Sequence, residues 1–222
     1  RAQPSLGKVY VSPDFFKIGV PVNTSSSGKG IDVLPAGSRI PVRGNKIRTF
    51  VHWEHAFDID SSLIIIDEEG NVSTIGFFNY YDKAYANDLL FSGDVTSPTG
   101  TEYYDMDLDG LRRHGIFRRH GIRYVIQAFH GFCSNLNSGE IYCGYQDKEN
   151  LNTKAWDPKN IELKIHVKGD TRAFMSFGID LETNEVVIFN MLLDSENRVV
   201  SGALKDTVMK YLSPSCLELN MG

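Results

Sequence analysis

The sequence predicts a mainly β protein, built either as a sandwich or as a barrel. From Lys46 onward the chain consists of short runs rich in Ile, Val, Phe and Tyr, separated by turn residues. Only one segment, near the end, places apolar residues at helical spacing. Many short strands with few helices are typical of both architectures, and the strand spacing alone does not separate them.

The first 45 residues differ in composition from the rest of the chain. They contain five prolines and the flexible run NTSSSGKG at 23–30. Proline removes a backbone donor and fixes φ, so regular sheet pairing is disfavoured there. We therefore predict an extended N-terminal arm over 1–45, packed on a domain that spans 46–222.

Seven runs within 46–222 have the composition of strands. They are KIRTFVHW at 46–53, SSLIIID at 61–67, STIGFFNY at 73–80, IRYVIQAF at 122–129, IELKIHV at 161–167, AFMSFGIDL at 173–181 and EVVIFNMLL at 185–193. Turn signals such as DEEGN at 67–71 and NSGE at 137–140 divide them. SGALKDTVMKYL at 201–212 predicts a short C-terminal helix, because Leu204, Val208 and Leu212 fall on one helical face.

Composition narrows the expected partners and location. The chain has 28 acidic and 23 basic residues and a net charge of -5, so nucleic acid is not an expected partner. No apolar run approaches the roughly 18 residues of a membrane span, and no membrane partner is expected. Three cysteines fit a reducing compartment better than a disulfide scaffold, which predicts a cytoplasmic protein. Other proteins are the expected partners.

Acidic side chains gather in two places. Asp58 and Asp60 flank Ile59, so on a strand both point to one face, where like charges repel unless a cation neutralises them. Ca²⁺ prefers clustered carboxylates and carbonyls, although a solvated strand end has the same spacing. A second loop, 89–102, contains Asp94, ends in Glu102 and is rich in Gly, Pro and Thr, which suits bending around an ion.

Four motifs lie in or near these acidic segments: FDID at 57–60, DEEGNV at 67–72, FFN at 77–79 and FSGD at 91–94. Together they resemble the TerD family, the tellurium-resistance or calcium-binding stress proteins, and especially its larger bacterial members. These motifs follow one another in the family's order within Arg48 to Phe132, and LPAGSRIPV at 34–42 agrees more weakly.

The resemblance implies a sandwich of two antiparallel sheets that holds Ca²⁺ in loops at one edge. Carried over position by position, it implies Asp58, Asp60, Asn79 and Asp94 as ligands, with Glu102 and the carbonyls of 95–101 as weaker candidates. The loop after FSGD reads VTSPTGTEYY, with fewer acids than the family pattern. This departure predicts weaker affinity or the loss of one of two sites.

Two further signals lie in 105–122. DMDLDG at 105–110 imitates the start of an EF-hand, but Ile116 stands where a bidentate Glu is needed, so we predict a strand followed by a turn. RRHGI occurs twice in RRHGIFRRHGI at 112–122, and the second copy is interpreted as an insertion in an edge loop. Its four arginines, Arg112, Arg113, Arg118 and Arg119, offer an anion-binding patch as the less favoured alternative.

The sequence lacks the local motifs of common enzymes, including GxSxG, HExxH, the P-loop and GxGxxG. The favoured hypothesis is a non-enzymatic calcium-binding module of the TerD type, acting in stress response, such as tellurite stress, or in complex assembly. Two alternatives stay open. One is an enzyme or enzyme-associated domain that binds a phosphorylated or nucleotide-like ligand, and the other is a calcium-dependent carbohydrate- or protein-binding module.

Overall fold

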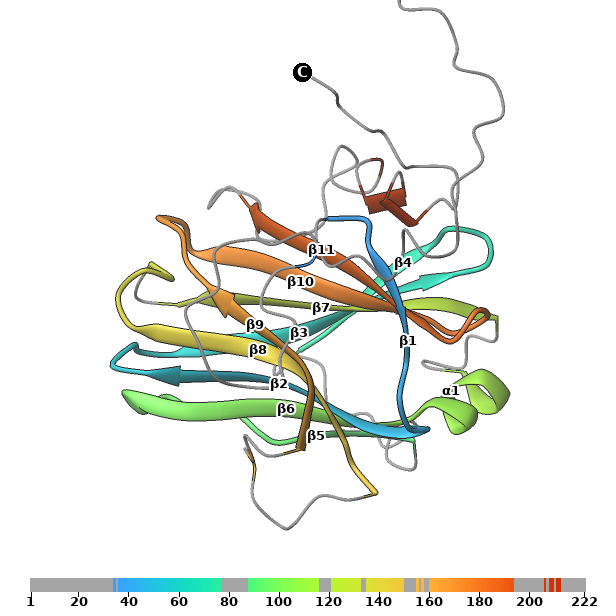
Figure 1. Ribbon diagram of the computed structural model, residues 1–222, viewed down its shortest axis with the longest axis horizontal. Coiled ribbons are helices and arrows are strands. Elements are labelled where there is room, and N and C mark those ends of the chain that lie inside the picture. Colours follow the sequence, from blue (N-terminus) through green and yellow to red (C-terminus); the bar gives the residue numbers. More distant parts are fainter. Residues whose placement is uncertain are drawn as a thin grey trace, which may run out of the picture.

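The computed structural model describes residues 34, 36–76, 88–115, 121–132, 135–149, 155, 157, 160–193, 206, 208–209 and 211–212. Within these residues the chain forms eleven strands, arranged as two sheets, and the helix α1, with further helical residues within 206–212 (Figure 1). Every strand pairing in both sheets is antiparallel. The predicted mainly β fold, a sandwich of two antiparallel sheets, is confirmed.

The larger sheet has six strands in the order β1-β11-β10-β7-β3-β4. Their bounds are β1 Arg39–Pro41, β11 Glu185–Leu193, β10 Ala173–Asp180, β7 Ile122–Gly131, β3 Ile59–Asp67 and β4 Val72–Ile75. β1 belongs to the segment predicted as an arm, and it pairs with β11 at the edge of this sheet. Most of that predicted arm, residues 1–33 and 35, lies outside the described residues.

The smaller sheet has five strands in the order β5-β6-β2-β8-β9. Their bounds are β5 Leu89–Phe91, β6 Thr99–Asp107, β2 Lys46–Glu54, β8 Glu140–Asp147 and β9 Ile161–Val167. β2 occupies the centre and pairs along its length with β6 and β8. Four strands, β1, β5, β6 and β8, are additions to the seven runs predicted from composition.

The main core lies between the two sheets and draws apolar side chains from both. Trp53 and Tyr104 come from the smaller sheet, and Leu63 and Phe177 from the larger, and all four are fully buried. Alternation along each strand places these residues inward, because successive side chains of a strand point to opposite faces. Burial of this apolar surface provides the main driving force for stacking the sheets.

A second apolar cluster covers the outer face of the larger sheet. Ile64, Ile126 and Phe189 from that sheet pack there with Val208 and Leu212. The described residues within 206–212 are helical, which confirms the predicted helix at these positions. Helical spacing brings Val208 and Leu212 onto one face, and that face is the buried one.

The prediction of a turn after the strand at 105–107 is wrong, because a helix, α1 Leu108–His114, follows β6 directly. Asp107 caps it, since its Oδ1 accepts a hydrogen bond of 2.9 Å from the Gly110 amide. Leu108 and Leu111, three residues apart, bury one side of the helix. The first RRHGI copy therefore starts within α1, whereas residues 116–120 of the repeat lie outside the described residues.

No helix among the described residues combines the length and apolar composition that crossing a membrane requires.

Candidate metal centre

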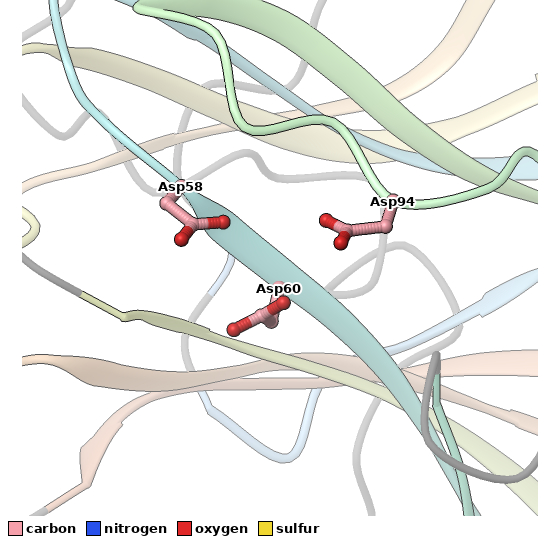
Figure 2. A group of neighbouring side chains, drawn as sticks. All are labelled: Asp58, Asp60 and Asp94. Carbon is pink, nitrogen blue, oxygen red and sulfur yellow. The ribbon is translucent and has the colours of Figure 1, made fainter.

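Three aspartates from two separate segments of the chain converge at one end of the sandwich. Asp58, Asp60 and Asp94 each direct a carboxylate oxygen to the same place, and these oxygens all lie within 4.8 Å of one another (Figure 2). Asp60 is buried, Asp58 is half-buried and Asp94 is exposed. In the part of the chain that the structure describes, no other group of three or more acidic, His or Cys side chains has this arrangement. We call these residues the three-aspartate group.

β3 and the residue just before it supply two of the three carboxylates, although by a different geometry from the one predicted. The strand begins at Ile59, so Asp60 lies on it while Asp58 precedes it. Asp58 has a left-handed backbone with φ of 55°, a conformation that Asp and Asn adopt more readily than most residues. The Asp58 carbonyl accepts a hydrogen bond of 2.8 Å from the Phe132 amide, which fixes this turn to the end of β7.

The loop between β5 and β6 supplies Asp94, and Trp53 holds this loop in place. The indole Nε1 of Trp53 donates a hydrogen bond of 2.9 Å to the Ser97 carbonyl. At the end of the loop, a Cβ on Gly100 would lie 2.5 Å from the Trp53 ring. Only glycine allows this close approach, so the ring and the loop pack together and position Asp94 beside β3.

Glu102, on the inward face of β6, lies next to this group but outside it. The side chain is fully buried. Its Oε2 accepts a hydrogen bond of 2.7 Å from the Ser61 amide, and its Oε1 accepts one of 3.0 Å from the Val95 amide. Both carboxylate oxygens therefore bind backbone, one on β3 and one on the Asp94 loop.

The acidic side chains raise one another's pKa values. Burial and the charges of Asp58 and Asp94 raise the pKa of Asp60 to about 6. Burial and the Asp94 charge also raise the pKa of Asp58, against the opposing effect of His130. Burial raises the pKa of Glu102 to about 8, although its two backbone hydrogen bonds favour the ionised form. The ionised cluster is thus unfavourable without a positive charge nearby.

His130 lies beside the buried member of the group. It faces Asp60 across the β3–β7 ladder, and its Nε2 lies 3.5 Å from Asp60 Oδ2. A single imidazole, charged only when protonated, offsets little of the charge of three carboxylates.

The donor set fits a hard divalent cation of the size of Ca²⁺. All three side chains offer carboxylate oxygens, without sulfur or imidazole among them. Two ligands on opposite sides of a Ca²⁺, each at about 2.4 Å, lie about 4.8 Å apart, so the observed spacing suits a shared ion. Ca²⁺ takes about six to eight oxygens, so carbonyls or water must add to the three carboxylates. The remaining predicted ligand, Asn79, lies outside the described residues.

The arginines of the alternative anion-binding patch are distributed differently. Arg112 ties α1 to the β10–β11 turn, since its Nε donates to the Leu181 carbonyl at 2.7 Å and its Nη2 to Asn184 Oδ1 at 2.8 Å. Its Nη1 bonds Asp109 within α1. These bonds occupy donors that an anion would need. Arg118 and Arg119 lie outside the described residues, and Arg113 is exposed in α1.

Comparisons of the chain with protein-family models, with curated proteins and with solved structures found no match. The TerD resemblance therefore depends on the sequence motifs alone.

Proposed function

We propose that this protein is a non-enzymatic calcium-binding module of the TerD type, acting in the cytoplasm in stress response or in the assembly of protein complexes. The observation that carries the proposal is the convergence of Asp58, Asp60 and Asp94 from two separate segments. These are three of the four positions at which the TerD-like motifs imply ligands. The stress role in this proposal comes from that resemblance alone.

A bound cation would join the two sheets at this end of the molecule. Asp60 belongs to β3 of the larger sheet, whereas Asp94 lies between β5 and β6 of the smaller one. Ca²⁺ supplies the positive charge that allows the three carboxylates to be ionised together. Ligands from both sheets would then hold the edge of the sandwich in one arrangement, which suits a surface that binds partner proteins only when the ion is present.

Titration of the metal-free protein with Ca²⁺ tests the proposal. We expect calorimetry to give a dissociation constant in the range of roughly 10⁻⁵–10⁻³ M, because the loop after Asp94 has few acids. The melting temperature should rise as Ca²⁺ saturates the site, since only the folded chain brings the three carboxylates together. Zn²⁺ at equal concentration should have less effect, because the group lacks nitrogen and sulfur ligands. If millimolar Ca²⁺ produces no heat and no shift in melting temperature, the proposed site is excluded.

Stability in the presence of a chelator should fall as pH rises. The pKa of Asp60 is raised to about 6 and that of Glu102 to about 8, so the folded state binds more protons than the unfolded state. The stabilising contribution of these protons is complete below about pH 4 and is lost as pH rises through about 6 and then about 8. Urea unfolding at a series of pH values measures this loss.

The variant Asp60→Asn serves as the control for this pH dependence, because it removes the carboxyl whose pKa is raised to about 6. Its stability should depend less steeply on pH between about 4 and about 7 than that of the unmodified protein. Saturating Ca²⁺ should also reduce the slope in the unmodified protein, since the ion favours the ionised carboxylates. If Asp60→Asn and the unmodified protein, both with chelator, show the same dependence of stability on pH, the assignment of the raised pKa to Asp60 is wrong.

A further inference from the structure

Glu102 connects the two segments that carry the predicted ligands. Ser61, whose amide it binds, directly follows Asp60 on β3, and Val95, whose amide it also binds, directly follows Asp94 in the loop. One buried carboxylate therefore holds the backbone at the residue after each of two carboxylates of the three-aspartate group. The distance between Asp60 and Asp94 depends on this bridge, because the two segments belong to different sheets.

β3 needs such a partner at this point along its edge. β4 pairs with β3 only from Leu63 to Ile66, so Ser61 lies beyond that ladder. The N–H and C=O of one strand residue point to the same side. Both groups of Ser61 are bound from β6, since Glu102 accepts from the amide and the Tyr104 hydroxyl donates to the carbonyl at 3.0 Å. Glu102 differs from Tyr104 in one respect, because it also holds the Asp94 loop.

We propose that Glu102 is a positioning residue of the calcium site: its carboxyl group, through both oxygens, bridges the Ser61 and Val95 amides and so sets the spacing of Asp60 and Asp94. This inference rests on the proposed calcium-binding function and adds a role to it. Glu102 acts through the backbone, with both oxygens occupied by amides, and the ion contacts belong to the aspartates. Residues that orient metal ligands in this way contribute strongly to affinity even though they do not touch the ion.

The variant Glu102→Gln tests the bridge with almost no change in size. A carboxamide has one oxygen and an NH₂ group, so one of the two amides would face a donor instead of an acceptor. We expect the Kd for Ca²⁺ to rise about 10–100-fold, the usual effect of removing a group that orients a ligand. Amide hydrogen exchange at Val95 or Ser61 should also become faster, and this readout does not need Ca²⁺.

Tyr104→Phe is the matched control. It removes a buried hydrogen bond from the same strand to the same residue, Ser61, without touching the loop. Its melting temperature should fall, while its Kd for Ca²⁺ and the exchange rate of the Val95 amide should stay unchanged. If Glu102→Gln does not fold, Glu102→Asp takes its place. Asp keeps a carboxyl group but is one methylene shorter, so it cannot reach both amides. The same loss of Ca²⁺ affinity is expected.

The outcomes separate this inference from the proposed function. If the unmodified protein binds Ca²⁺ and Glu102→Gln binds it equally well, the positioning role is wrong while the calcium site stands. An equal loss of affinity in Tyr104→Phe would show that general loosening of β3 is responsible, which also overturns the inference. Absence of Ca²⁺ binding in the unmodified protein overturns both.

Discussion

Asp180→Ala is expected to lower the free energy of unfolding by about 3 kcal/mol, because it leaves two arginines without their buried partner. The Asp180 side chain is fully buried at the end of β10. Its Oδ2 accepts hydrogen bonds of 3.2 Å from Arg39 of β1 and from Arg123 of β7. The arginines are partly exposed, which places the expected loss at the low end of the range for broken buried ion pairs.

Asp180 also has a second role, which a matched variant separates from the first. Its Oδ1 accepts hydrogen bonds from the backbone amides of Glu182 and Thr183 in the β10–β11 turn. Asp180→Asn keeps an oxygen for these amides and removes only the charge, so its loss should be smaller than that of Asp180→Ala. Urea unfolding followed by circular dichroism measures both. Equal stability of Asp180→Ala and the unmodified protein would contradict a structural role for this network.

The strands that could be predicted are those whose inward and outward positions differ in polarity or whose whole run is apolar. β3 and β11 read as Ile- and Val-rich runs because the larger sheet is covered on both faces, by the main core and by the cluster that includes Val208 and Leu212. Runs of this kind give a clear signal without knowledge of their partners.

The first part of β6, residues 99–104, was missed because buried polar residues break its pattern, whereas a strand was predicted at its end, 105–107. Its inward positions carry Glu102 beside Tyr104 and Met106, and its outward Asp105 is itself buried in a pair with Arg48 at 2.7 Å. From the sequence alone, Glu102 ends a predicted loop and Asp105 lies on a predicted strand, and nothing in their spacing indicates that either side chain is buried. Their partners come from β2, β3 and the 92–98 loop, so only the three-dimensional contacts show why acidic residues lie inside a strand.

The candidate site also has some features that could be predicted from the sequence and others that could not. The closeness of Asp58 and Asp60 could be predicted from spacing, although the left-handed backbone of Asp58 could not. Asp94 was predicted as a ligand only through the family resemblance, because sequence spacing does not indicate that the loop after β5 lies beside β3. α1 was missed for a different reason: Asp107 reads as the third position of an EF-hand-like run or as a helix cap, and the buried Leu108 and Leu111 decide between the two.

Replacing Asp58 and Asp60 by asparagine together is expected to abolish the stabilisation by Ca²⁺. In the unmodified protein that stabilisation should reach about 2.7 kcal/mol at a hundredfold excess of ion over Kd. The double variant removes two of the three carboxylates that converge within 4.8 Å, and neutral amide oxygens are weaker ligands for Ca²⁺. Unfolding in the absence of Ca²⁺, and in its presence at a hundredfold excess over the measured Kd, gives the difference.

The fold should survive this change, because both substitutions suit their positions. Asn adopts the left-handed backbone of Asp58 as readily as Asp does. At Asp60 a neutral side chain relieves the unfavourable burial that raises the pKa of this carboxyl, so the chelated variant should be at least as stable as the chelated unmodified protein. A control variant, Asp109→Asn with Glu162→Gln, removes the same number of charges outside the three-aspartate group and should keep the full response to Ca²⁺. If the double variant still gains the full stabilisation, Ca²⁺ binds elsewhere on the chain and the three-aspartate group is a cluster of acids without an ion.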